Sequence, residues 1–267
     1  MRNSAKFENT NPPSPTAHEY ECPDCKDENG YLVHEMARDA EGNEYRKDYW
    51  RVCECVERKR VARLFRSSNI TEAFRQITFD DFTLEGRPKC VHSAYHAVRD
   101  YVDHFDEIRR SDSNSIALLG KPGSGKTHLL IAASNVLINR GVGVLYFPWA
   151  EGSDEILQAS REDDDTYSKR IEAMKHVDVL FIDDLFKGRT VPTDFQMKWL
   201  FAVINYRYLN NLPMFISSER TANKLRGIDD AIERRIYERS GPFLIEMLLD
   251  KSERGMHLNY SHKDDEP

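Results

Sequence analysis

The stretch Gly120-Lys121-Pro122-Gly123-Ser124-Gly125-Lys126-Thr127 fits the GxxxxGK[ST] pattern of phosphate-binding loops. It lies between a short apolar stretch and an amphipathic one, the strand–loop–helix context that this motif requires. Glycines let successive backbone N–H groups turn toward phosphates, and the N-terminus of the following helix adds partial positive charge. We expect Lys126 to reach the β- and γ-phosphates of a nucleoside triphosphate and Thr127 to offer its hydroxyl to Mg²⁺. The expected nucleotide-binding residues of the loop are Gly120, Pro122, Gly123, Ser124, Gly125, Lys126 and Thr127.

Apolar and amphipathic stretches alternate on both sides of this loop, which is typical of a parallel α/β sheet. Expected strands cover residues 115–119, 142–147, 177–182, 213–217 and 243–248. Expected helices cover residues 90–110, 127–140, 167–175 and 195–210. The pattern therefore predicts an α/β fold with a five-stranded parallel sheet.

Two carboxylates end the stretch of residues 177–184, VDVLFIDD, about 50 residues after the loop. Carboxyl ends of parallel strands meet at one edge of a sheet, so Asp183 and Asp184 are expected beside the phosphate loop. We expect Asp183 to hold Mg²⁺ through water and Asp184 to polarise the attacking water. Because the chain has no GxGxxG motif, the two motifs together favour nucleoside triphosphate hydrolysis over dinucleotide redox chemistry.

The next expected strand ends in Ser217-Ser218-Glu219. A polar side chain there, with Ser218 as the candidate, could touch the γ-phosphate and report its hydrolysis. The alternative is a simple hydroxyl at a strand-to-turn junction.

Several arginines follow within residues 230–239, DAIERRIYER. In oligomeric ATPases, an arginine at such a place reaches the γ-phosphate bound by the neighbouring subunit. The sequence periodicity does not show which of these arginines would reach the γ-phosphate. The alternative is that they are ordinary surface residues.

Four of the five cysteines form two close pairs, Cys22-Pro-Asp-Cys25 and Cys53-Glu-Cys55. Two such turns can complete the tetrahedron of sulfurs that zinc prefers. The pattern predicts a four-cysteine zinc site, with His34 as a possible substitute ligand. The alternatives are a redox CxxC or reduced structural thiols. Cys90 has no partner at suitable spacing and is interpreted as a small apolar residue.

The 267 residues carry a net charge of −7, which argues against coating duplex nucleic acid through overall basicity. Residues 46–75 nevertheless hold nine Lys or Arg against four Asp or Glu. This local excess favours either a solvated helix face or a contact with nucleic acid or an acidic partner. The chain has neither an apolar run long enough for a bilayer nor a readable secretory signal, so we expect a cytoplasmic location.

Composition and motifs together predict the domain organisation. Residues 1–20 are expected as a flexible leader, 21–66 as a zinc-binding domain, 67–89 as a connector, 90–258 as the ATPase core and 259–267 as a polar tail.

The order of the segments CPDC, CEC, NITEAFRQITFDDF, GKPGSGKT, VDVLFIDDLF, INYRY, ISSE and AIERRIYE resembles bacterial and phage replicative helicase loaders of the DnaC/DnaI type. The resemblance covers roughly residues 22–249. It implies an AAA+ core that binds ATP and Mg²⁺, self-association through that core, contact with single-stranded DNA, and an N-terminal zinc domain that binds a hexameric DnaB-type helicase.

The resemblance also assigns residues by position. It implies that Arg235 is the arginine finger, with Arg234 and Arg239 as rivals, and that Ser218 and Glu219 occupy the γ-phosphate sensor position. The implied activity is a slow ATPase stimulated by partner or DNA. Phe147 and Trp149, near the end of the second core strand, are expected either to stack on DNA bases or to lie in the core.

The expected function is thus ATP-dependent loading of a ring helicase onto single-stranded DNA at the start of replication. Two alternatives remain. An ATP-binding helper of a transposase shares this core but normally lacks the cysteine-rich segment. A DNA-binding adaptor would bind nucleotide without hydrolysing it.

Overall fold

The computed structural model describes residues 20–40, 42–162, 165–188 and 191–248. The backbone divides into an N-terminal unit that ends at Lys59 and a core unit that begins at Arg60. The expected domain boundary lies after residue 66. Most of the expected leader, the end of the expected core and the whole expected tail lie outside the described residues.

The N-terminal unit is built on an antiparallel hairpin of β1 (Gly30–Arg38) and β2 (Glu44–Val52). Its register pairs Gly30 with Val52 at the base. Two cysteines precede the hairpin and two follow it, so pairing of the strands brings all four to its base. Helix α1 (Cys55–Ser67) begins directly after the hairpin.

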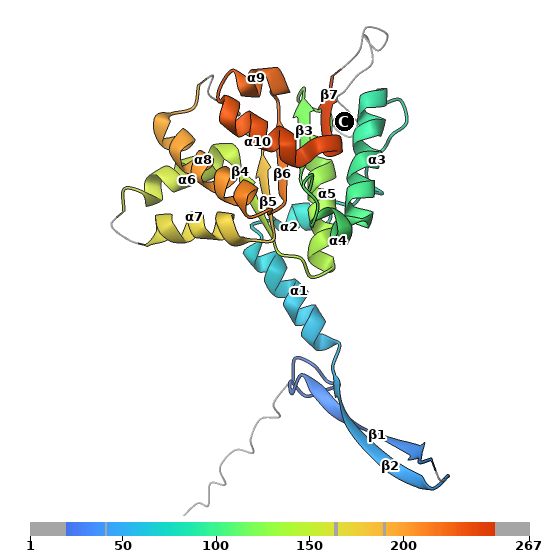
Figure 1. Ribbon diagram of the computed structural model, residues 1–267. Helices are drawn as coiled ribbons and strands as arrows, with labels where there is room; N and C mark the ends of the chain where they lie inside the picture. The colour runs from blue at the N-terminus through green and yellow to red at the C-terminus, as the bar shows by residue number, and fades with distance from the viewer. Residues whose placement is uncertain (1–19, 41, 163–164, 189–190, 249–267) are drawn as a thin grey trace, which may run out of the picture. The chain divides into compact units, whose positions relative to one another are not determined.

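The core unit contains the predicted five-stranded parallel sheet, in the order β4-β5-β6-β3-β7 (Figure 1). Each observed strand overlaps its expected range, with ends that differ by one or two residues. The strands are β3 (Ile116–Gly120), β4 (Val144–Pro148), β5 (Val179–Asp183), β6 (Met214–Ser218) and β7 (Leu244–Met247).

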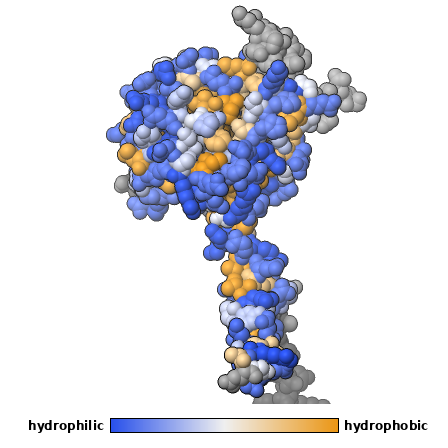
Figure 2. Space-filling model, turned by 45° about the vertical axis from the view of Figure 1, so that its right-hand side comes forward, coloured by the Kyte–Doolittle hydropathy of each residue, from blue (hydrophilic) through white to orange (hydrophobic). Residues whose placement is uncertain are grey.

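Helices cover both faces of this sheet (Figure 1). Neighbouring residues of a strand face opposite sides. Ile116 therefore packs in one apolar cluster with residues of α3 and α5, and Ala117 packs in another with residues of α6, α7, α8 and α10. The helices are α2 (Glu72–Arg75), α3 (Lys89–Asp103), α4 (Phe105–Ile108), α5 (Lys126–Asn139), α6 (Trp149–Ala159), α7 (Thr166–His176), α8 (Asp194–Leu209), α9 (Ala222–Arg226) and α10 (Asp230–Ser240), with a 3-10 turn at Gly241–Phe243. The face of the core seen in Figure 2 is largely hydrophilic, with smaller apolar patches.

The structure differs from two of the sequence predictions for the core and selects between the alternatives of a third. The expected helix over 90–110 is interrupted at His104, whose φ of −107° and ψ of 20° are not helical. Residues 67–89, expected as a connector, contribute Ile70, Phe79 and Phe82 to the core. For Phe147 and Trp149 the core alternative holds, because they are 6% and 3% exposed and both pack on the ring of Trp199.

Arg207, in the INYRY segment, is fully buried and ties α7 to the starts of two strands. Its guanidinium donates hydrogen bonds to backbone carbonyls of α7, of the loop before β5 and of Pro213 before β6. Burial lowers the pKa of this side chain to about 9. The carbonyl oxygens accept its donors and keep β5 and β6 aligned, so that their carboxyl ends meet at the site described below.

Candidate nucleotide site and cysteine cluster

The phosphate loop connects the end of β3 to the start of α5. Gly120 and Gly125 have φ values of +134° and +95°, which favour glycine. A Cβ atom on Gly120 would lie 2.5 Å from the carbonyl oxygen of Met247, and one on Gly125 would lie 2.5 Å from the ring of Phe82. The glycines of the motif therefore meet two local requirements, left-handed backbone and close packing.

Lys126 lies at the first turn of α5 and is only 5% exposed. Its ammonium donates to the carbonyl oxygens of Gly120 at 3.0 Å and Lys121 at 2.9 Å. Burial lowers the pKa of the Lys126 side chain. The charge is thus held inside the loop, where anionic phosphate oxygens would be stronger acceptors than carbonyls.

Asp183 is buried at the end of β5 and accepts hydrogen bonds from three hydroxyls. Thr127 Oγ1 lies 2.8 Å from its Oδ1, and Ser217 also donates to Oδ1. Tyr146, on the neighbouring strand β4, donates to Oδ2 at 3.0 Å. Burial raises the pKa of Asp183, and the bonds from Ser217 and Thr127 oppose that rise. The structure brings Thr127 and Asp183 together as expected, and their oxygens suit a hydrated Mg²⁺ ion.

Asp184 follows in a left-handed conformation, with φ of +54°. Its backbone N–H donates to Ser217 Oγ at 2.7 Å. Its carboxylate accepts from Lys187 Nζ at 2.7 Å, and Lys187 lies 3.4 Å from Glu219 Oε1. The bond to Asp184 raises the pKa of Lys187. Lys187, which was not singled out in the sequence, thus belongs to the site and neutralises the carboxylate expected to act on water.

The two serines at the end of β6 point to different surroundings. Ser217 contacts both Asp183 and Asp184. Ser218 is buried, donates to the carbonyl of Leu185 at 2.7 Å and accepts from the N–H of Arg220. The hydroxyl beside the two aspartates is therefore that of Ser217, whereas the expected sensor residue, Ser218, contacts Leu185 instead. The parallel register of β5 and β6 explains why Ser217 is the one beside Asp183. It pairs Ile182 with Ile216 and so sets residue 183 beside residue 217.

The three candidate arginines of α10 have different environments. Arg235 is half-buried and donates to Asn205 Oδ1 at 2.9 Å and to the carbonyl of Ala231. The side chain of Arg234 is 73% exposed and pairs with Glu238 at 2.8 Å. Arg239 is 13% exposed and donates to Asp112, Tyr208 and Asn211 of its own chain. Arg239 therefore serves the packing of this chain. Arg235 and Arg234 are left as candidates for the arginine finger.

The four paired cysteines form one buried cluster. Their sulfurs lie within 4.8 Å of one another, with 3.7 Å between Cys22 and Cys53 and 3.4 Å between Cys25 and Cys55. Zn–S bonds of about 2.3 Å at tetrahedral angles separate sulfurs by about 3.8 Å, so these side chains fit a zinc ion.

The thiols of the cluster differ in pKa. A hydrogen bond from the backbone of Cys25 lowers the pKa of the Cys22 thiol to about 7, whereas burial raises that of Cys55 to about 12. Four thiolates this close need a positive charge among them. His34, the possible substitute ligand, instead bonds Asp48 at 2.7 Å on the hairpin. Cys90 packs against the core, in agreement with its interpretation as an apolar residue.

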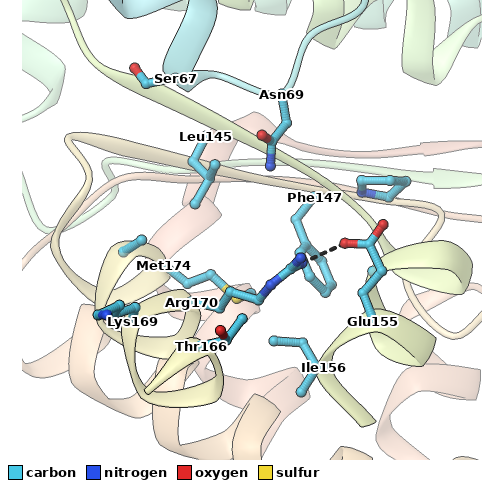
Figure 3. A pocket seen from close by; sticks show the side chains of 13 residues that line it. Ser67, Asn69, Leu145, Phe147, Glu155, Ile156, Thr166, Lys169, Arg170 and Met174 are labelled. Atoms are coloured by element: carbon cyan, nitrogen blue, oxygen red, sulfur yellow. Dashed lines mark hydrogen bonds and ion pairs between the residues drawn. The ribbon is translucent and has the colours of Figure 1, made fainter. Parts of the chain in front are cut away.

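A cavity of about 560 Å³ lies elsewhere in the core unit, between β4, α6 and α7 (Figure 3). Leu145, Phe147, Ile156 and Met174 form apolar parts of its wall. An ion pair of 2.5 Å joins Arg170 to Glu155 across it (Figure 3). The cavity contains no residue of the phosphate loop and neither Asp183 nor Asp184, so it is separate from the candidate nucleotide site.

The fold and the site define a class of protein, the P-loop ATPases of the AAA+ type. Residues 74–239 match the family model of the bacterial DnaA ATPase domain. The chain belongs to this family. Among the described residues, no helix is both long and apolar enough to cross a membrane.

Known relatives extend this assignment. The phage-like element PBSX protein XkdC of Bacillus subtilis (strain 168) is 41% identical over 238 residues, which cover 88% of this chain and 85% of the relative. A crystal structure of the DnaC helicase loader matches 66% of this chain and 99% of its own, with a TM-score of 0.56 and 20% identity, and supports the fold alone.

A structure of the replication initiator DnaA bound to AMPPCP and single-stranded DNA is 28% identical, with a TM-score of 0.52. It matches 68% of this chain, which spans about half of that DnaA chain, 52%. The resemblance drawn from the sequence is therefore confirmed at the level of a DnaC-like AAA+ replication protein with an ATP-binding ATPase domain.

Proposed function

We propose that this chain is an ATP-dependent loader that delivers a hexameric replicative helicase of the DnaB type onto single-stranded DNA at the start of replication. The observation that carries the proposal is the pairing of two units in one chain. One holds a phosphate loop with Thr127 and Asp183 in contact. The other holds four clustered cysteines under an exposed hairpin.

In this function the core binds MgATP. Lys126 neutralises phosphate charge, Thr127 and Asp183 hold the hydrated Mg²⁺, and Asp184 orients the attacking water. The ion pair with Lys187 engages one oxygen of the Asp184 carboxylate and makes that carboxylate a weaker proton acceptor. This pairing supports slow hydrolysis in the isolated chain and stimulation when DNA or the helicase separates Lys187 from Asp184.

The test compares two variants of the full chain. Lys126→Ala is expected to weaken ATP binding at least tenfold, because the buried ammonium is lost from the loop. Asp184→Asn is expected to bind ATP as the wild type does and to hydrolyse it at least tenfold more slowly. Fluorescent-nucleotide titration and phosphate release measure the two effects. ATP turnover of Asp184→Asn at the wild-type rate would refute the role of Asp184. A wild type that binds ATP without any turnover, with DNA and helicase present, would favour the adaptor.

The N-terminal unit offers a surface for the helicase on one face of its hairpin. The exposed apolar side chains on that face are Leu32, Met36, Trp50 and Val52, between 52% and 66% exposed. The indole of Trp50 packs over Gly30. A Cβ atom on Gly30 would lie 2.4 Å from the indole nitrogen of Trp50. We call these four residues the apolar hairpin face. Exposed apolar patches of this kind mark interaction sites.

The charged residues on the same side of the hairpin are paired with one another. Arg46 and His34 both contact Asp48, and Arg38 pairs with Glu44 at 2.7 Å. Little uncompensated charge remains there to attract DNA phosphates. The partner best suited to this face is therefore an apolar protein surface, which supports the helicase and not DNA as its occupant.

Trp50→Ser is expected to weaken binding to the purified cognate helicase by about 30-fold, the loss typical of an interface hot spot. Tyr45→Ser is the matched control, because Tyr45 is 48% exposed on the opposite face of the hairpin. It should change the affinity less than threefold. Biolayer interferometry measures both, with zinc content showing that the unit stays folded. Equal losses for the two variants, or none for Trp50→Ser, would overturn this assignment of the face.

A further inference from the structure

A buried tyrosine of the edge strand reaches the carboxylate expected at the magnesium site. Tyr146 is 7% exposed and donates its hydroxyl to Asp183 Oδ2 at 3.0 Å. The hydroxyl comes from β4. The sequence motifs for nucleotide binding lie elsewhere, in the phosphate loop and at the ends of β5 and β6. No motif of the sequence identifies it.

Several contacts fix the orientation of Tyr146. Its backbone N–H donates to the carbonyl of Ser68 at 2.8 Å. Its ring packs edge-on against Phe181 at 5.2 Å between centroids and against Phe74 at 5.8 Å. These contacts hold both the backbone and the ring of Tyr146, so its hydroxyl has a defined position. Little side-chain conformational entropy is therefore lost when the hydroxyl donates to Asp183.

The two carboxylate oxygens of Asp183 thereby receive different partners. Oδ1 accepts from Thr127 and Ser217, and Oδ2 accepts from Tyr146. Rotation of an aspartate about its χ2 torsion is soft and nearly two-fold, so the torsion alone would not hold the carboxylate plane. The bond to Tyr146 anchors the oxygen that points away from Thr127, and so keeps Oδ1 toward the Thr127 hydroxyl.

We propose that Tyr146 is a positioning residue for MgATP, acting through Asp183. This inference rests on the proposed function, in which Thr127 and Asp183 hold the hydrated Mg²⁺. Residues that orient metal-binding side chains typically change metal affinity by about 10–100-fold when lost. Tyr146 therefore sets how much Mg²⁺ the chain needs to bind nucleotide tightly, without touching nucleotide itself.

The experiment removes one oxygen atom. Tyr146→Phe keeps the ring and its contacts with Phe181 and Phe74, so it is expected to fold. Binding of a fluorescent ATP analogue is titrated against Mg²⁺. The Mg²⁺ concentration at half-maximal binding should rise about tenfold, while the affinity measured in EDTA stays at the wild-type value. The kcat for ATP should recover toward the wild-type value at saturating Mg²⁺.

Tyr101→Phe is the matched control. Tyr101 is also buried, and its hydroxyl donates to the carbonyl of Asn114, away from the phosphate loop. Both variants lose a buried hydroxyl bond and some thermal stability, but Tyr101→Phe should keep the wild-type Mg²⁺ midpoint. Equal midpoints for Tyr146→Phe and the wild type would overturn the inference, as would an equal shift in Tyr101→Phe.

The wild-type titration separates this inference from the proposed function. If the wild type binds the analogue no more tightly with Mg²⁺ than in EDTA, the assignment of Thr127 and Asp183 to a magnesium site fails, and the role of Tyr146 fails with it. If wild-type binding depends on Mg²⁺ and the Tyr146→Phe midpoint is unchanged, only the role of Tyr146 is lost.

Discussion

Replacement of Arg235 by alanine is expected to lower ATP turnover stimulated by DNA or helicase by about 10³-fold or more, because a finger from a neighbouring subunit contributes about 10³–10⁵ to such rates. ATP affinity should stay within twofold of the wild type. In the isolated chain the guanidinium bonds Asn205 and Ala231 and lies 4.9 Å from the ring centroid of Phe201. On assembly it would exchange these neutral partners for the γ-phosphate of the adjacent subunit.

Mixing two inactive variants tests whether the arginine acts between subunits. Lys126→Ala supplies an intact finger and Arg235→Ala an intact pocket, so mixed oligomers should regain part of the ATP turnover. Arg234→Ala is the comparison, because Arg234 is exposed and paired with Glu238. A larger loss of ATP turnover for Arg234→Ala than for Arg235→Ala would move the finger to Arg234. No recovery in mixed oligomers that are shown to form would rule out a finger at Arg235 that acts across subunits.

Removal of zinc is expected to unfold the N-terminal unit and leave the core folded. The buried apolar cluster of that unit consists of the four paired cysteines, with Val56 packed against it, so little else stabilises it among the described residues. In zinc-finger peptides, structural zinc contributes about 10–16 kcal/mol. Cys55→Ser should therefore make residues 20–52 sensitive to protease, with ATP affinity unchanged.

Cys90→Ser is the matched control for this prediction, because Cys90 packs against the core outside the cluster. It should retain one zinc per chain by elemental analysis and resist protease as the wild type does. Wild-type protein without zinc and with five titratable thiols would contradict the zinc site. The same protease sensitivity in both variants would mean that loss of the metal is not the cause.

Much of the core was predictable because its signals are local. The strands are continuous apolar runs, and the phosphate loop joins one of them to a helix. The hairpin was not predictable in this way, because GYLVHEMAR and EYRKDYWRV expose both faces and lack an apolar alternation. Helix α6 was also missed, since it begins at Trp149 directly where β4 ends.

Two of the contacts that the sequence missed depend on how strands align, and a third depends on a turn. Ser217 and Ser218 are adjacent in sequence and both polar, and only the register of β6 on β5 distinguishes them. Tyr146 reaches Asp183 because β4 pairs with β5, with Pro148 opposite Asp183. Lys187 reaches Asp184 through the turn between them, where Asp184 and Phe186 have left-handed backbones. Neither strand register nor the conformation of this turn is marked by a sequence motif.

The most direct test of the central claim is a loading assay with the full chain, its cognate helicase and a circular single-stranded DNA. After separation of DNA from free protein, the amount of helicase ring on the circle is measured with and without ATP. The account predicts that helicase accumulates on the circle only when this chain and ATP are both present, and that Lys126→Ala and Trp50→Ser each reduce it at least tenfold. Equal amounts of helicase on the circle with and without this chain would contradict it.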